Sequence, residues 1–198
     1  MIKSLKHNLT RLIDFSGRET RSQFWPYAGA VLVAVFVVMG GSMGFQVNRT
    51  FAAMETYAAE HPEDVTVVRT PTSTSMSINA DADLPPELIP DFQAILAPVM
   101  VSVVIAVLLL ASPVVRRLHD RNRSFWWGVP PPILLMTGFS GMMALFGTIG
   151  TSSEDEFFAL FPMIFINNVA YIASLIVLVI QLSGSGSPQA NRFGPVQG

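Results

Sequence analysis

Four long runs of apolar residues divide the chain, and the segments between them are much more polar. The runs cover residues 26–45, 95–115, 125–146 and 161–182. An α-helix rises about 1.5 Å per residue, so roughly 20 residues cross the roughly 30 Å of hydrocarbon in a bilayer. Runs this continuous, without alternating polar positions, indicate helices rather than barrel strands. The pattern therefore predicts an all-α membrane protein, a four-transmembrane-helix bundle.

The segment before the first run, residues 1–25, has a helical pattern of its own. Its apolar residues recur every three or four positions while its cations fall elsewhere on the turn, which predicts an N-terminal amphipathic interfacial helix in the headgroup plane. The apolar positions are Ile2, Leu5, Leu9, Leu12 and Ile13. Ser16-Gly17-Arg18-Glu19 then matches a capping box, which predicts a second short helix starting near Gly17.

Residues 46–94 form the longest polar segment, predicted to be an extended periplasmic loop. The first helix can continue to Glu60, where His61-Pro62 should stop it. The β-prone stretches 65–68 and 75–78 predict a small hairpin. Prolines at 85, 86 and 90 then break the chain before the second run.

Composition supports the membrane assignment. The chain is 51% hydrophobic and 13% charged, whereas about a quarter of the residues in a soluble domain are charged. With no cysteine, a disulfide and a thiolate metal site are both excluded. A cleaved signal peptide over residues 1–42 is the alternative for the first run, and the long basic lead argues against it.

The charges are distributed unevenly between the polar segments. Ten of the 12 Lys and Arg residues lie in 1–25, 116–124 and 183–198, while 46–94 holds the other two with eight carboxylates. Segment 147–160 has three carboxylates and no cation. The positive-inside rule therefore predicts an inner (plasma) membrane protein with both termini in the cytoplasm.

The runs contain no charged residue, which argues against ion-coupled pumping. Their polar residues cluster in the fourth run at helical spacing, and this indicates hydrogen bonds between helices, with a polar substrate path as the alternative. The candidates are Asn167, Asn168, Tyr171 and Ser174. Gly138 and Gly141 form a small face on the third run, typical of close helix packing.

Three sequence blocks outside the runs resemble one known family. FSGRETRSQFW (15–25) resembles F-x-G-R-x-x-R-x-x-F/Y-W, RRLHDRNRSFWW (116–127) resembles R-R-L-H-D-x-G-R-S-G-W-W, and NRFGP (191–195) is similar to N-x-F/Y-G-P. These are motifs of the bacterial membrane family called domain of unknown function 805. The chain departs from them at Asn122 and Phe125, where the family usually has glycine. Asparagine tolerates the left-handed conformation that glycine supplies.

Because the chain is predicted to cross the membrane four times, all three blocks are expected at the same, cytoplasmic face. Two hypotheses follow: ion pairs that tie helix ends together, or a site for anionic lipid headgroups or a partner protein. Arg116 and Asp120 are four residues apart, which predicts a pair on one helical face. The candidate binding residues are Arg18, Arg21, Trp25, Arg116, Arg117, His119, Asp120, Arg123, Trp126, Trp127, Asn191 and Arg192.

Enzymatic chemistry is not expected. A zinc or di-metal site needs three or four ligands, which the three histidines, one of them at position 61, cannot supply on this face. No serine has an evident oriented base, and no phosphate-binding glycine loop or other cofactor motif is present. Gly184-Ser185-Gly186-Ser187 has the composition of a flexible linker.

We therefore expect a non-catalytic scaffold or accessory subunit that binds membrane lipids, another membrane protein or further copies of itself, and no nucleic acid. The alternative is a component of an oligomeric transporter or channel for a small solute.

Overall fold

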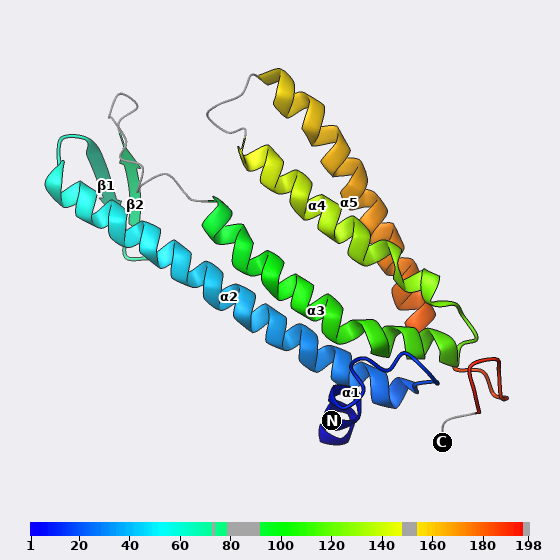
Figure 1. Ribbon diagram of the computed structural model, residues 1–198. Coiled ribbons are helices and arrows are strands. Elements are labelled where there is room, and N and C mark those ends of the chain that lie inside the picture. The colour runs from blue at the N-terminus through cyan, green and yellow to red at the C-terminus, as the bar shows by residue number, and fades with distance from the viewer. Residues whose placement is uncertain (73, 79–91, 148–153, 196–198) are drawn as a thin grey trace. The chain divides into compact units, whose positions relative to one another are not determined.

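The computed structural model describes residues 1–72, 74–78, 92–147 and 154–195 (Figure 1). Five α-helices and one two-stranded sheet account for most of them. The helices are α1 (Ile2–Leu9), α2 (Arg21–Glu60), α3 (Phe92–Asp120), α4 (Pro130–Gly147) and α5 (Glu154–Ser183). A short 3-10 helix, η2 (Phe125–Gly128), precedes α4.

Four helices are long and apolar enough to cross a membrane, namely α2, α3, α5 and the helical stretch Phe125–Phe146 that contains α4. In the most apolar window of each, only 11% to 17% of the residues are buried inside the protein. Most of their apolar side chains are therefore available to lipid, as expected of a multi-pass membrane protein.

Several helix ends differ from the limits of the apolar runs. α3 continues to Asp120, so the first arginines of segment 116–124 are helical. α5 begins at Glu154, inside the segment that the sequence assigns to a loop. α4 begins with Pro130 because the first turn of a helix leaves its amides without intrahelical partners and so tolerates proline.

α2 starts later than the capping-box pattern predicts. Gly17 has φ +77°, and the helix begins only at Arg21. The carboxamide of Gln23 accepts the amide of Thr20 at 3.1 Å, so Thr20 with Gln23 forms this contact of a capping box. The predicted Ser16–Glu19 box is therefore wrong, because the Glu19 side chain turns inward to an arginine.

The chain divides into two compact units, which we describe separately: residues 1–38 with 100–198, and residues 39–99. In the second unit, α2 ends at Glu60 and an antiparallel hairpin follows, as predicted. β1 (Val65–Arg69) pairs with β2 (Thr74–Ile78), with Val65 opposite Ile78. The prolines at 85, 86 and 90 lie outside the described residues.

In the first unit, two apolar clusters hold the helices together. One joins α2, α3 and α5, and consists of Phe24, Ala28, Leu118, Leu178 and Leu182. The other joins α2 to α3 through Tyr27, Val31 and Ala106. The clusters draw the beginning of α2 and the ends of α3 and α5 together, and this positions the site described below.

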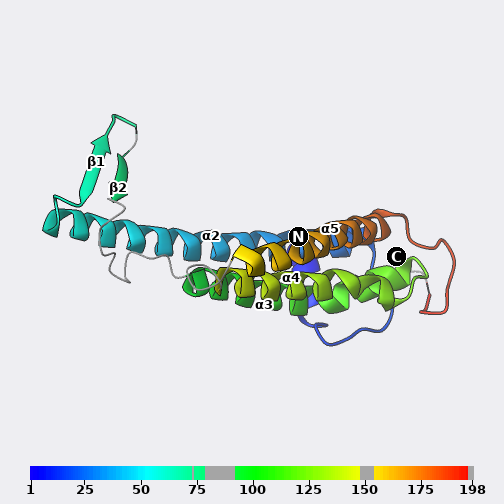
Figure 2. The same ribbon diagram turned by 90° about the horizontal axis from the view of Figure 1, so that it is seen from above.

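α4 and α5 lie side by side, as Figures 1 and 2 both show. A Cβ added at Gly141 would lie 3.0 Å from the Ile164 side chain. One added at Gly138 would lie 2.8 Å from the amide nitrogen of Asn167. The two glycines thus allow the helices to approach closely, as their spacing predicts.

Candidate functional site

The three sequence blocks meet at one end of the first unit. Nδ1 of His119 lies 3.3 Å from the carbonyl of Gly17, and Nδ2 of Asn191 donates to the carbonyl of His119 at 2.9 Å. Residues from the first, second and third block are therefore in direct contact, although Gly17 and Asn191 are 174 positions apart in the sequence. We call this region, residues 1–25, 116–127 and 183–195, the arginine end.

Arg18 joins the first block to both others. Its side chain is 1% exposed, and it forms an ion pair with Asp120, with Nε donating to Oδ1 at 2.9 Å. Its remaining donors point at the tail, to the carbonyls of Ser187 at 2.7 Å and Gln189 at 3.0 Å. The guanidinium fork thus holds the C-terminal segment against the end of α3.

Arg116 is fully buried and ties α3 to the N-terminal segment. Its Nε donates to Oε2 of Glu19 at 2.9 Å. The other donors reach α1, the turn after it and Ser112 on α3 itself, so one side chain ties α3 to both α1 and that turn. These acceptors are Asn8 Oδ1 at 2.6 Å, the Arg11 carbonyl at 2.9 Å, Ser112 Oγ at 3.0 Å and the Asp14 carbonyl.

Arg117 lies one residue further along α3 and faces the end of α5. It is 1% exposed, pairs with Asp120, and donates through Nε to the Leu182 carbonyl at 2.9 Å and through Nη2 to the Gly184 carbonyl. Arg121 adds a bond to the Gln181 carbonyl at 2.7 Å. The last carbonyls of a helix have no intrahelical partner and carry partial negative charge, so these arginines cap α5.

The buried cluster contains three arginines but only two carboxylates, Glu19 and Asp120. The carbonyls at the end of α5 compensate part of the excess positive charge. The predicted pair between Arg116 and Asp120 does not form. Arg116 turns to Glu19, and Asp120 instead bridges Arg117 and Arg18. In the described part of the chain, Oε1 of Glu19 has no hydrogen-bond partner.

The tail from Gly184 to Ser187 is bonded rather than free, so its interpretation as a flexible linker is wrong. The amide of Ser187 donates to the Asp120 carbonyl at 2.8 Å. A Cβ at Gly186 would fall 2.1 Å from Oδ2 of Asp120, and one at Gly184 would fall 2.3 Å from the Arg121 guanidinium. The glycines are needed for close approach to the charged side chains.

The last block folds over the end of α3. The ring of Phe193 stacks on the His119 ring with centroids 3.8 Å apart, and the guanidinium of Arg192 lies 4.6 Å from the Phe193 centroid. Asn122 has φ 57°, the left-handed conformation anticipated from its position. The backbone amide of Asn122 donates to the His119 carbonyl, and the backbone amide of Arg123 donates to the Leu118 carbonyl. These two bonds form a Schellman cap at the end of α3.

The remaining candidates form an exposed rim around this core. Trp25, Trp126 and Trp127 are 38%, 66% and 42% exposed. Arg123 lies over the ring of Trp127, with 5.8 Å to its centroid. Arg21 is exposed and donates to the Ser183 carbonyl at 3.3 Å.

Asp14 belongs to the turn after α1. Its carboxylate accepts the amide of Ser16 at 3.0 Å and Nε of Arg11 at 2.9 Å. These contacts, with the Ser16 hydroxyl contributing most and Arg11 next, hold the pKa of Asp14 well below its usual range. The carboxylate is therefore ionised at neutral pH and stabilises the turn whose carbonyls bind Arg116.

The intramembrane candidates behave mainly as structural groups. Asn167 accepts the Thr137 hydroxyl at 2.7 Å and donates to the Leu134 carbonyl at 2.9 Å, which joins α5 to α4. Asn168 and Ser174 bond to carbonyls of their own helix, those of Ile164 and Tyr171. The four residues do not form one polar path through the hydrogen bonds described here.

Sequence reasoning missed two members of the buried cluster. Asn8 and Ser112 are 0% exposed, and each contacts Arg116. The signal available for Asn8 was its place on α1 opposite the apolar stripe, beside Ser4, whose hydroxyl donates to the Gln23 carbonyl. Among the described residues, no three His, Asp or Glu side chains gather in a way that could hold a metal ion.

Four helices that are long and apolar enough to cross a membrane define a multi-pass α-helical membrane protein. The chain belongs to the family described as protein of unknown function DUF805, whose profile matches residues 12–195. No curated protein and no solved structure matches the chain. The matched region includes all three blocks and the four spans between them.

Proposed function

We propose that this protein is a non-catalytic membrane scaffold or accessory subunit whose arginine end faces the cytoplasm. The exposed cations and tryptophans of that end would bind anionic lipid headgroups or an acidic surface of a partner protein. Second copies of the chain are a further candidate partner, and nucleic acid is not, because lipid is the nearer polyanion.

The observation that supports this proposal is that some charges at the arginine end form ion pairs and others do not. All three carboxylates there, Asp14, Glu19 and Asp120, are paired with arginines. The exposed cations form no ion pair within the described part of the chain. They are Lys3, Lys6, Arg21, Arg123 and Arg192.

This division separates two roles within one sequence signature. Arg18, Arg116 and Arg117 face internal acceptors and hold the fold, so their substitution would not report on binding. Arg123 and Arg192 lie over aromatic rings at the surface, with their charges exposed to solvent. Each cation near an anionic surface contributes about 1 kcal/mol, and tryptophan belongs at the level of the headgroups.

Intrinsic fluorescence can test the proposal, because all three tryptophans of the chain lie at the arginine end. Purified protein is reconstituted in phosphatidylcholine vesicles that contain equal mole fractions of brominated phosphatidylglycerol or brominated phosphatidylcholine. We expect stronger quenching by the anionic lipid. Arg123→Gln and Arg192→Gln should each weaken this preference by about fivefold, the equivalent of 1 kcal/mol.

Arg49→Gln is the matched control, since Arg49 is an exposed arginine outside the arginine end. It should leave the preference unchanged. Equal quenching by the two lipids would contradict headgroup binding. Crosslinking in native membranes, with loss of a protein partner in the Arg123 and Arg192 variants alone, would then favour the protein-binding form of the proposal.

A further inference from the structure

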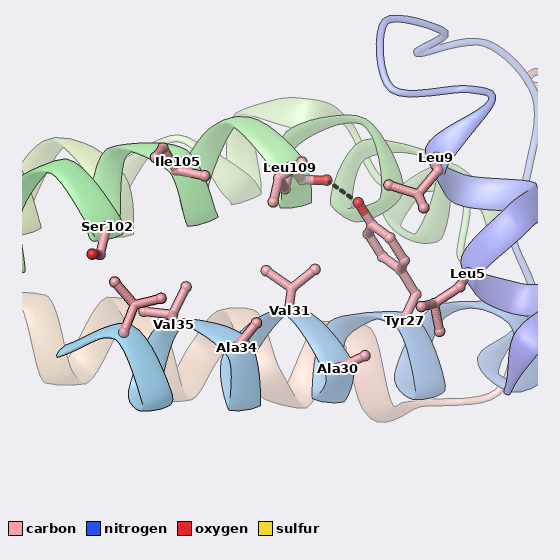
Figure 3. Close-up of a pocket in the computed structure, with 11 residues that line it drawn as sticks. Leu5, Leu9, Tyr27, Ala30, Val31, Ala34, Val35, Ser102, Ile105 and Leu109 are labelled. Carbon is pink, nitrogen blue, oxygen red and sulfur yellow. Dashed lines mark hydrogen bonds between the residues drawn. The ribbon is translucent and has the colours of Figure 1, made fainter. Parts of the chain in front are cut away.

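An apolar groove lies between α1, α2 and α3 in the first unit (Figure 3). Its volume is about 280 Å³, and its lining is apolar except for Tyr27 and Ser102. The Tyr27 hydroxyl donates to the Leu109 carbonyl at 3.2 Å, so its polar atom is already satisfied. The groove thus offers hydrocarbon surface to a ligand and almost no hydrogen bonds.

The shape of the groove follows from small residues on one face of α2. Tyr27, Ala30, Ala34 and Val38 recur at three- and four-residue spacing, so they share a face of the helix. The two alanines leave space where larger side chains would close the gap to α3. At about 1.5 Å per residue, Tyr27 and Val38 are roughly 16 Å apart along the axis, about half the hydrocarbon thickness of a bilayer.

One end of the groove is formed by Leu5 and Leu9 of α1, as Figure 3 shows. On the same side α1 exposes Ile2, which is 83% accessible, whereas its polar residues Ser4 and Asn8 are buried against the protein. This distribution suits a helix that lies at the boundary between headgroups and acyl chains. With α1 at that boundary, the groove would start at headgroup level and continue through one leaflet.

The unpaired charge at that end is positive, because Arg11 in the turn after α1 is paired with Asp14. α1 and the turn after it carry Lys3, Lys6, His7 and Arg11 and no carboxylate before Asp14. Lys3 and Lys6 are exposed, and Lys6 is adjacent to Leu5 and one turn from Leu9. A ligand with a hydrocarbon chain in the groove would thus have its polar group beside lysine ammonium groups, which favours an anion.

We infer that the groove binds one acyl chain of an anionic phospholipid, with the lipid phosphate beside Lys6. This inference deepens the proposed function, since it rests on lipid binding at the arginine end and assigns a defined site to one such lipid. The length of the groove, its apolar lining and the cationic mouth all match this occupant. None of the three tryptophans lines the groove, so the tryptophan rim can be tested separately.

Photocrosslinking can locate the acyl chain. The full-length protein is reconstituted in phosphatidylcholine vesicles with a small fraction of phosphatidylglycerol that carries a diazirine along one acyl chain, and labelled residues are mapped by mass spectrometry. We expect label on Ala30, Ala34 and Ile105 in excess of label on Val33, which is 63% exposed on another face of α2. Uniform labelling around α2 would overturn the inference, because it indicates bulk lipid only.

Two substitutions with the same new side chain give the comparison its control. Ala34→Phe fills the groove and should reduce labelling of Ile105 by roughly tenfold, the change expected when about two methylene contacts are lost. Val33→Phe places the same ring on another face of α2 and should leave the labelling of Ile105 unchanged. Equal labelling in the two variants would overturn the inference, and the wild-type pattern still decides if Ala34→Phe does not fold.

The headgroup is tested with Lys6→Gln and a phosphatidylcholine probe carrying the same diazirine. Lys6→Gln should lower groove labelling by phosphatidylglycerol about fivefold and leave labelling by phosphatidylcholine unchanged. Equal labelling by both probes in the wild type would refute the preference for an anion. Loss of the groove labelling pattern with intact tryptophan quenching would reject the groove site and retain the proposed function. Loss of the preferential quenching with an intact labelling pattern would reject headgroup binding at the tryptophan rim and retain the groove site.

Discussion

At the scale of single residues, the arginine end depends on the geometry of the guanidinium group. A guanidinium has five N–H donors in a planar fork, whereas a lysine ammonium has three on one atom. Arg116 uses its donors on a carboxylate, an amide, a hydroxyl and two carbonyls. Lysine could keep the charge at this position but could not satisfy all these acceptors.

Arg116→Met should destabilise the protein strongly. The substitution leaves the Glu19 carboxylate buried without its counter-ion, and breaking a buried pair in this way costs about 3–5 kcal/mol. Thermal unfolding in detergent, monitored by size-exclusion chromatography, measures the loss. Arg123→Met is the control, because the Arg123 side chain is exposed and contacts only an aromatic ring among the interactions described. Similar losses in the two variants would contradict the assigned roles.

The double variant Glu19→Leu, Arg116→Met separates the charge effect from simple loss of contacts. Removing both charged groups leaves the net charge of the cluster as in the wild type, and such replacements are often close to neutral. We therefore expect the double variant to be more stable than Arg116→Met alone, with a clearly non-additive cycle. A double variant that loses the sum of the two single effects would show that Glu19 and Arg116 act independently.

Gly186→Ala should release the C-terminal tail. The new methyl group would collide with Oδ2 of Asp120, and that carboxylate cannot move away without breaking its pairs with Arg18 and Arg117. Limited proteolysis should cleave the tail of the variant at protease concentrations that leave the wild type intact. Gly29→Ala is the control: its Cβ meets nothing within 4 Å, and alanine should stabilise the helix by about 0.5–1 kcal/mol.

Local sequence could identify which residues matter here but not how they pair. The left-handed conformation of Asn122 follows from the side chain itself, and the structure confirms it. The expected pair between Arg116 and Asp120 rested on helical spacing, yet the partner of Arg116 is Glu19, 97 positions earlier. The spacing rule describes isolated helices, in which such a pair is worth about 0.2–0.5 kcal/mol. Here Asp120 is buried between Arg18 and Arg117, and the Arg116 side chain reaches Glu19 instead.

At the scale of elements, the start of α2 also depends on a long-range contact that the local sequence does not show. The sequence offers two overlapping capping patterns, Ser16 with Glu19 and Thr20 with Gln23, and each satisfies the local rule. Only the second is used, because Glu19 pairs with Arg116. The hairpin and the end of α2 at Glu60 were predictable, since proline and strand propensity act within a few residues.

The pairing of α4 with α5 makes a specific prediction for two adjacent asparagines. Asn167→Leu removes both hydrogen bonds to α4 and should cost about 0.6–2 kcal/mol. Asn168→Leu is the matched control, because Asn168 bonds only to a carbonyl of its own helix among the contacts described. Thermal unfolding in the same detergent compares them. The assignment would be wrong if Asn168→Leu proved the more damaging change.

At the scale of the whole molecule, the four spans could be read from hydropathy, and the meeting of the blocks could be inferred from charge. The docking of the tail could not. Gly184-Ser185-Gly186-Ser187 has the composition of a linker, and nothing in it shows that its backbone carbonyls will accept bonds from buried arginines 169 and 67 positions away. Composition describes the conformational freedom of an isolated segment. The backbone carbonyls of this segment can accept bonds from the arginines only after folding has brought the ends of α3 and α5 together.

The distribution of charge also predicts orientation. Ten cations lie at the arginine end against two in residues 46–94, so the positive-inside rule predicts that both termini lie in the cytoplasm. Alkaline phosphatase fused at residue 70 should be active in a bacterial host, and green fluorescent protein fused after residue 198 should fluoresce. Arg123→Gln with Arg192→Gln should not change this pattern, because eight cations remain. The opposite signals would place the unpaired cations away from the anionic leaflet and would remove the basis for headgroup binding.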